Sequence, residues 1–227
     1  MPEKDWPQCA RCPHDWADRY CRREGGKPAE FCPSVHYRDL VKESLKVTLD
    51  DEHREFARQA SIQEGEGYGG REKGYSRIRP IKTRLEEVME FSEKMGFKKL
   101  GLAFCIGLRK EAAIVEEIFT ANGFMVASVA CKAGRTPKEE LGLRDDQKVA
   151  PGSFESMCNP ILQAMVLNRV KTDFNVLLGL CVGHDSLFLK HAEAPCTVLA
   201  VKDRQLAHNP LAAVYQADAY YRSIKNK

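Results

Sequence analysis

Four cysteines lie within the first 32 residues of the sequence, at Cys9, Cys12, Cys21 and Cys32. The Cys-x2-Cys pair places two thiolates within reach of one ion, and the two later cysteines complete a four-coordinate site. The segment is polar and has too few apolar residues for a core, so a bound metal would supply most of its folding free energy. This spacing predicts a metal site in residues 1–35; four unrelated free thiols are the alternative.

The identity of the metal in this first site is open between two candidates. Zinc and iron–sulfur clusters both accept four thiolates. The gaps of eight and ten residues match neither the paired knuckles of a zinc ribbon nor a ferredoxin run. We expect zinc rather than a second iron–sulfur cluster, because nothing in the segment requires redox chemistry. His14 and His36 could replace a cysteine as ligands, but solvated surface histidines are the simpler interpretation.

Four further cysteines stand at the ends of apolar runs or at the start of a helix. Cys105 and Cys181 each follow such a run and precede a glycine by two residues, Cys131 follows another run, and Cys158 directly precedes a helix start. In an open parallel sheet, ligands gather beyond the carboxyl ends of the strands, and a helix N-terminus favours a thiolate. We therefore expect three or four of these thiolates to converge on an iron–sulfur cluster of the 4Fe-4S type. Coincidence among buried cysteines and metal-free redox or nucleophilic thiols are the alternatives.

Two more residues are interpreted from their positions relative to this edge. Cys196 begins an apolar run, so it falls at the opposite edge of the sheet and has a structural role. His184 follows Cys181 by three residues in a turn that Asp185 is expected to cap, which would place its ring near the thiolates. A histidine there could serve as the proton donor of a reaction. A turn histidine bonded to backbone is the alternative.

The hydrophobic pattern supplies the elements that must position these side chains. Continuously apolar runs at 98–104, 124–130, 174–180 and 196–201 predict strands, and helical patterns cover 80–95, 108–121, 159–170 and 209–223. Apolar strands that alternate with helices indicate an α/β fold, a small doubly wound parallel sheet of about four strands with helices on both faces. The common order 2-1-3-4 places Cys105 and Cys181 on neighbouring strands at the topological switch.

The predicted organisation has three parts. Residues 1–35 form the cysteine-rich metal knuckle, and residues 80–227 form the α/β domain. Residues 36–79 between them form a helix, from Tyr37 to about Gln63, and a glycine-rich loop. The loop at 65–77 is too rich in glycine for regular structure.

Composition bounds the environment and the partners of the chain. The 35 basic and 32 acidic residues among 227 leave a net charge of +3, which argues against a nucleic-acid binder that neutralises phosphates. No apolar run approaches the roughly 18–20 residues that cross a bilayer, and the first 16 residues lack the apolar core of a signal peptide. We expect a cytoplasmic protein without membrane contact. An odd number of cysteines in a reducing compartment then favours metal or thiol chemistry over disulfides.

Several segments together resemble a known family. CARCPHDWADRYC, AFCIGLRKEA, VACKAG, PGSFESMCNP, GLCVGHDSLFLKHAEAP and VKDRQLAHNP are similar to motifs of an uncharacterised prokaryotic family, common in anaerobes and labelled as cysteine-rich metal-binding proteins with a domain of unknown function. The resemblance covers nearly the whole chain, except that the GEGYGGREKGYSR loop is not matched motif by motif. It implies that both groups of four cysteines belong to family motifs, and it implies no substrate.

Three functions are compatible with these residues. The first is an iron–sulfur enzyme of the lyase or desulfidase type, in which three cysteines leave one iron open as a Lewis acid for a small, sulfur-containing substrate. The second is a zinc-binding regulatory or redox-sensing protein without catalysis. The third is an electron carrier with all four core thiolates bound and a redox partner.

Overall fold

The structure is a computed structural model, and it describes residues 6–225. The chain divides into two compact units between Glu64 and Gly65. Each unit is described by itself below.

The first unit is helical and has almost no apolar core. Short 3-10 turns at Cys9–Arg11 and Trp16–Asp18 precede α1 (Pro33–His36), α2 (Arg38–Thr48) and α3 (Arg54–Glu66). Within residues 6–64, Ala29 and Gln63 are the buried residues. Hydrophobic burial therefore contributes little to the folding of this unit.

A single helix was expected from Tyr37 to about Gln63, and the structure divides it at residues 49–53. The carboxylate of Asp50 accepts a hydrogen bond from the His53 backbone N–H at 2.9 Å. An aspartate that bonds the backbone three residues on favours the start of a helix over its continuation. The helical period was correct here, but the break was missed.

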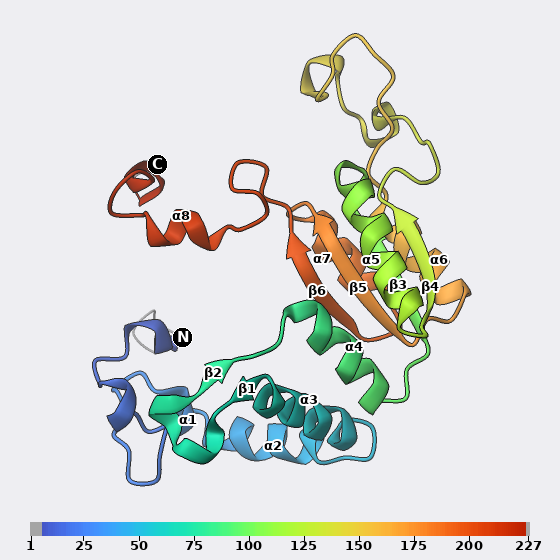
Figure 1. Ribbon diagram of the computed structural model, residues 1–227. Coiled ribbons are helices and arrows are strands. Elements are labelled where there is room, and N and C mark those ends of the chain that lie inside the picture. Colours follow the sequence, from blue (N-terminus) through green and yellow to red (C-terminus); the bar gives the residue numbers. More distant parts are fainter. Residues whose placement is uncertain (1–5, 226–227) are drawn as a thin grey trace. The chain divides into compact units, whose positions relative to one another are not determined.

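The second unit holds a four-stranded parallel sheet (Figure 1). Its strands are β3 (Lys99–Phe104), β4 (Met125–Ala130), β5 (Phe174–Leu180) and β6 (Cys196–Val201). They lie in the order β4-β3-β5-β6, which is the predicted 2-1-3-4 order. Every residue of β5 is buried, whereas every residue of β6 is half-buried, as befits a central and an edge strand.

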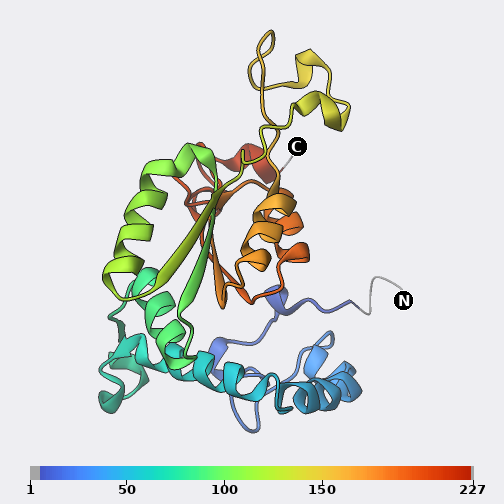
Figure 2. The same ribbon diagram turned by 90° about the vertical axis from the view of Figure 1, so that its right-hand side faces the viewer.

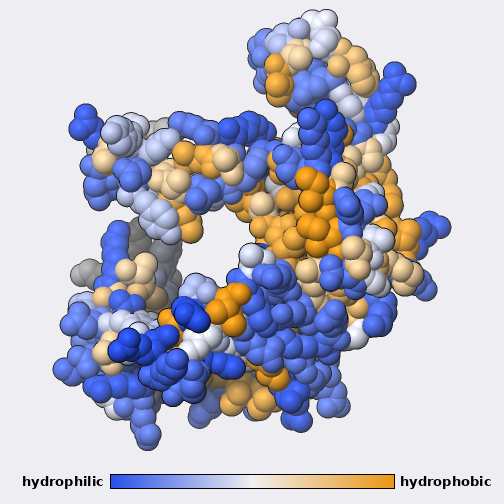
Figure 3. Space-filling model, in the orientation of Figure 1, coloured by the Kyte–Doolittle hydropathy of each residue, from blue (hydrophilic) through white to orange (hydrophobic). Residues whose placement is uncertain are grey.

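Helices cover both faces of this sheet, as predicted. Figure 2 shows α5 (Arg109–Ala121) on one face and α6 (Pro160–Arg169) and α7 (His184–His191) on the other. The core beneath α6 and α7 is apolar and includes Leu167 and Phe188, both fully buried. Figure 3 shows apolar side chains gathered in the region of the sheet, whereas most of the visible surface is polar.

The second unit begins with the glycine-rich loop, which is closed by a short antiparallel ladder. β1 (Tyr68–Gly69) pairs with β2 (Arg79–Pro80), so the ends of the glycine-rich loop are held together. The helix expected over 80–95 begins only at Arg84 as α4 (Arg84–Lys94), because Pro80 belongs to β2. Thr83 caps α4 through a capping box with Glu86.

Two further expectations about helix ends were wrong. Gly183, not Asp185, occupies the N-cap of α7, and the Asp185 carboxylate instead accepts from the backbone N–H of Ser186 at 2.8 Å. The final helix, expected over 209–223, is reduced to α8 (Leu211–Tyr215), followed by turns and a 3-10 turn at Arg222–Lys225. A proline at a helix start marks where a helix can begin but carries no information about its length.

Residues 132–157 form a lobe that projects beyond the end of β4 (Figures 1 and 2). The lobe contains two 3-10 turns, Lys138–Leu141 and Asp145–Gln147, and a bridge between Pro137 and Ser156 closes its base. None of the helices among residues 6–225 has the length and apolar character of a membrane span.

Candidate thiolate site at the carboxyl edge of the sheet

The parallel strands bring cysteines from distant parts of the sequence to one edge. Cys105 directly follows β3, Cys131 follows β4 and Cys181 follows β5. Cys158 reaches the same edge from the other direction, because Asn159 is the N-cap of α6 and its backbone N–H donates to the Cys131 carbonyl at 2.7 Å. Three strand ends and one helix start therefore supply the four sulfurs.

Cys131 is the centre of a group of three thiols. It is 3 % exposed, and its thiol is hydrogen-bonded to those of both Cys105 and Cys158. A hydrogen bond with Cys131, together with Lys202, lowers the pKa of Cys105 to about 5. A hydrogen bond with Cys131 also lowers the pKa of Cys158 to about 6, while the pKa of Cys131 itself is raised. Near neutral pH, Cys105 and Cys158 are thus thiolates on either side of Cys131, which stays protonated.

Hydrogen-bond donors and cations surround these sulfurs. The backbone N–H of Ile106 donates to the Cys131 sulfur at 3.4 Å. The positive charges of Lys132 and His184 help to lower the pKa of Cys158. The predicted proton donor His184 is therefore close to a cysteine of the group, at the start of α7.

Among the described residues, no hydrogen bond joins the remaining two cysteines of the sheet unit to this group. Cys181 lies at the same edge, and its sulfur accepts a hydrogen bond from Nη2 of Arg204 at 3.1 Å. Cys196 begins β6, where burial raises its pKa, and its thiol donates to the Ala194 carbonyl at 3.3 Å. Cys196 thus takes the structural position expected for it.

Gln163 is a site-positioning residue that sequence reasoning missed. It is fully buried in α6, and its Nε2 donates to the carbonyls of Phe104 at 3.2 Å and Val129 at 2.6 Å. These carbonyls lie at the ends of β3 and β4, one residue before Cys105 and two before Cys131. Its Oε1 is buried without a hydrogen-bond partner among the described residues. A polar residue inside the apolar run of α6 was the available signal.

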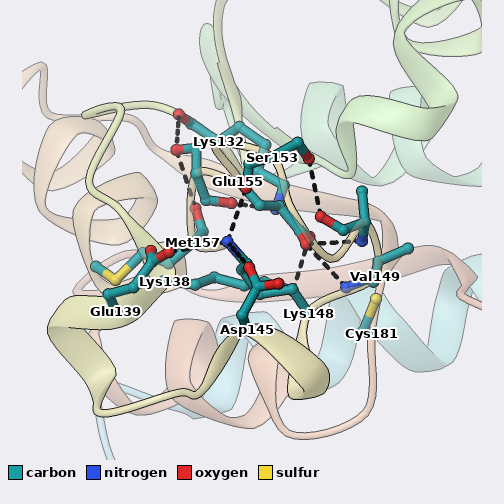
Figure 4. A network of polar contacts seen from close by, with 12 residues as sticks. Lys132, Lys138, Glu139, Asp145, Lys148, Val149, Ser153, Glu155, Met157 and Cys181 are labelled. Carbon is teal, nitrogen blue, oxygen red and sulfur yellow. Dashed lines mark hydrogen bonds and ion pairs between the residues drawn. The ribbon is translucent and has the colours of Figure 1, made fainter.

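Ion pairs give the lobe between Cys131 and Cys158 a fixed structure (Figure 4). The buried ammonium of Lys148 contacts Asp145 at 2.6 Å, Glu139 at 2.9 Å and the Ser153 carbonyl at 2.7 Å. Hydrogen bonds to Asp145 and Glu139 raise the pKa of Lys148. The lobe is thus an ordered insertion rather than a loose loop.

A second network lies nearer the base of the lobe. Lys138 pairs with Glu155 at 2.7 Å and lowers the pKa of that carboxyl to about 2. Lys132, which directly follows Cys131, lies 3.7 Å from Glu155 and donates to the Ser156 carbonyl. The base of the lobe is therefore tied to both of its cysteine-bearing ends.

In the first unit, all four N-terminal cysteines line one small cavity of about 60 Å³. Cys9 and Cys21 are exposed, and Cys12 and Cys32 are half-buried. The two histidines considered as ligands are engaged elsewhere. Nε2 of His14 contacts the Pro28 carbonyl at 3.2 Å, and Nε2 of His36 contacts the Glu30 carbonyl. The cysteines converge without either imidazole.

Among residues 6–225, no group of three or more His, Cys, Asp or Glu side chains is arranged as a ready ion site. The nine cysteines are all free thiols.

Comparison with known proteins places these residues in a wider group. Residues 32–199 match the profile of a family described as Protein of unknown function (DUF1847). An uncharacterized protein of Methanocaldococcus jannaschii is 48% identical over 134 residues, which are 59% of this chain and 67% of that protein. No solved structure matches the chain. Neither description names a metal, a substrate or a reaction.

Proposed function

The chain belongs to the DUF1847 family of unknown function, and we propose that it is a metal-binding protein with an iron–sulfur cluster at the carboxyl edge of its sheet. Cys105, Cys131 and Cys158 are the proposed ligands. The observation that carries the proposal is that Cys131 contacts both other thiols, although the three come from separate segments. Soft thiolates of this kind select zinc, Cu(I) or iron–sulfur clusters.

The donor set fits an anionic cluster in two further respects. An N–H group points at the Cys131 sulfur, and hydrogen bonds to sulfur are among the features that tune such centres. The pKa of Cys131 is raised, first by its hydrogen bonds with Cys105 and Cys158 and then by burial, so its thiol keeps its proton while its two neighbours ionise. A metal ion would supply the missing positive charge and favour the third thiolate.

Three thiolates leave one position of a cubane open, and such an iron supplies a Lewis acid for a small substrate. Within this proposal, His184 is the group of the chain that holds a proton beside Cys158, and the substrate binds at the same edge. Cys181, whose sulfur accepts a hydrogen bond from Arg204, is left outside the proposed ligand set.

The test is the iron, sulfide and zinc content of protein purified without oxygen. We expect about four irons with matching sulfide in the wild type, their loss in Cys131→Ser, and their retention in Cys196→Ser. The cluster proposal would be contradicted if the wild type contained zinc without sulfide and Cys131→Ser lost that zinc. His184→Gln should keep the iron, since the histidine is proposed as a proton donor and not as a ligand.

A thiol redox centre is the second candidate, and the low pKa of Cys105 favours it. An oxidant converts a thiolate and an adjacent protonated thiol to a disulfide. The oxidant accepts two electrons, and the thiol releases its proton. Peroxide treatment of metal-free protein should then lower the summed mass of the Cys105 and Cys131 peptides by two hydrogens. The redox centre is ruled out if the protein as purified contains iron and the thiols of the metal-free protein form no disulfide with peroxide.

We further propose that the first unit binds zinc through Cys9, Cys12, Cys21 and Cys32. The shared cavity supports this, and so does the lack of buried side chains in residues 6–64 other than Ala29 and Gln63. Without a core, metal coordination is the available source of folding free energy. Cys12→Ser should lose one zinc and the hydrogen-exchange protection of the first unit, while the sheet stays protected. His36→Gln, whose ring bonds a carbonyl, is the matched control and should keep the zinc.

A further inference from the structure

Two cations in the segment that follows β6 have no carboxylate partner. Lys202 and Arg204 directly follow the strand in the motif VKDRQLAHNP. In the part of the chain that the structure describes, neither forms an ion pair with Asp or Glu. An unpaired cation usually extends into solvent, but Arg204 donates to the Cys181 sulfur at 3.1 Å and Lys202 is hydrogen-bonded to Cys105. Their placement therefore calls for an explanation other than a structural ion pair.

The turn that carries them is held in a fixed and costly shape. The Asp203 carboxylate accepts from the backbone N–H groups of Gln205 at 3.0 Å and Leu206 at 2.8 Å. Ala207 and His208 both adopt positive φ angles, 49° and 65°, which non-glycine residues rarely do. Such strain persists where the surrounding structure requires it and is concentrated at functional sites. The turn fixes the direction in which Lys202 and Arg204 leave the backbone.

Both cations lie against the thiolate edge. A Cβ atom built on Gly107 would be 3.7 Å from Lys202 Nζ and 3.8 Å from the Cys105 sulfur, so the ammonium and that sulfur flank one glycine. A Cβ atom on Gly179 would be 3.8 Å from the same ammonium. These distances are ordinary van der Waals contacts, so the two glycines mark where the ammonium lies, between the ends of β3 and β5 and beside Cys105.

Arg204 approaches the neighbouring strand end. One of its terminal nitrogens, Nη2, donates to the Cys181 sulfur at 3.1 Å. A guanidinium has five N–H donors in a planar fork, so most of them stay available. Arg204 is exposed, and the side chain is open to a molecule that enters from solvent. A planar fork with free donors matches the two oxygens of a carboxylate.

We propose that Lys202 and Arg204 form an anion subsite beside the cysteines, and that the substrate is a small molecule bearing a carboxylate or a comparable oxyanion. The inference deepens the proposed function, because it names the chemical class of the substrate of that site. The subsite would fix the anionic end of the molecule against the β6–α8 turn. Its reactive end would then face Cys181 and the three grouped thiols.

The test compares two alkylating reagents of nearly equal size, the anion iodoacetate and neutral iodoacetamide. Both react with the thiolate, so their rate ratio at one cysteine cancels the thiolate fraction and its nucleophilicity. The ratio therefore reports local electrostatics alone. Full-length protein as purified without oxygen is alkylated at neutral pH and low salt, and mass spectrometry gives the rate at each cysteine. Cys181 is the main readout, since it lies outside the proposed ligand set.

We expect iodoacetate to be favoured at Cys181 relative to Cys196, the internal reference at the opposite edge. A single charge a few ångströms away in a wet site changes such a ratio by about fivefold. Arg204→Gln should therefore lower the ratio at Cys181 about fivefold, and Arg204→Lys should restore most of it. Raising the salt to 1 M should weaken the preference, because the screening length falls to about 3 Å.

Lys190→Gln is the matched control, since it removes one positive charge from the exposed last turn of α7. It should leave the ratio at Cys181 unchanged. If Arg204→Gln slowed both reagents equally, Arg204 would only activate the thiol and the anion subsite would be wrong. A wild-type ratio at Cys181 equal to that at Cys196 would overturn it as well. Metal content does not enter this readout, so the subsite and the cluster can fail separately.

Discussion

The ionisation of Cys105 leads to a quantitative prediction about its reactivity. Its pKa is lowered to about 5, first by the hydrogen bond with Cys131 and further by Lys202. At pH 6 about nine-tenths of such a thiol is ionised, compared with about 0.3% of an ordinary cysteine with a pKa near 8.5. In metal-free protein, Cys105 should therefore hold roughly 300 times more thiolate at pH 6 than a free cysteine. Iodoacetamide reacts with the thiolate, so the rate reports this fraction.

Two substitutions separate the causes of this low pKa. Lys202→Met removes an adjacent positive charge, which should raise the midpoint of the pH–rate profile by about one unit. Cys131→Ala removes the hydrogen bond that is the larger cause, so the midpoint should rise further than in Lys202→Met. Cys196→Ser, at the other edge of the sheet, should leave the profile of Cys105 unchanged.

The assay is pulsed alkylation between pH 4.5 and 9, with the labelled peptide quantified by mass spectrometry. Rates at the highest pH correct for differences in access and nucleophilicity. A wild-type midpoint at or above pH 8 would refute the reasoning, because Cys105 would then titrate like a solvated thiol. A shift in Lys202→Met larger than that in Cys131→Ala would show that the order of causes is wrong.

Three further outcomes follow from the packing around the site. Gln163→Leu should lower the free energy of unfolding by about 1–3 kcal/mol in urea, because two buried carbonyls lose their donor while one unpaired oxygen is removed. Gly179→Ala should cost about 1–3 kcal/mol more than Gly96→Ala, since both have positive φ but only the first would place its Cβ within 2.2 Å of a leucine side chain. Lys148→Met should abolish hydrogen-exchange protection in residues 132–157 and leave that of β3 and β5 unchanged, because Lys148 is the centre of the lobe's ion pairs.

The sheet could be derived from the sequence because two independent signals agreed. Four continuously apolar runs, separated by helical patterns, indicated the number and type of strands, and their order was taken as the common 2-1-3-4 order of such sheets. The same reasoning placed Cys105, Cys131 and Cys181 at one edge and Cys196 at the other. All strands of a parallel sheet run in the same direction, so a residue that follows a strand lies at the carboxyl edge and a residue that begins one lies at the opposite edge.

The cations of the site were not predicted, and the reason is physical. Lys202 and Arg204 follow β6, whose first residue, Cys196, was assigned to the far edge, and no cysteine marks the other end of that strand. Side-chain contacts such as the one between Arg204 and Cys181 depend on a turn whose shape rests on positive φ angles. The sequence shows no glycine in that turn to mark them. Basic residues directly after a predicted strand were the available signal.

The base of the lobe holds the two cysteines at its ends in position. The lobe leaves the sheet at Cys131 and returns at Cys158, yet backbone hydrogen bonds close its base, from Asn159 to the Cys131 carbonyl at 2.7 Å and from Met157 to the Thr136 carbonyl at 2.8 Å. The separation of the two sulfurs is therefore determined beneath the lobe, and changes farther out need not alter it. Lys132 is the exception, because it bonds within the base and its charge also acts on Cys158. Loss of Lys132 should consequently raise the pKa of Cys158. Changes near Lys148, farther out in the lobe, should leave that pKa unchanged.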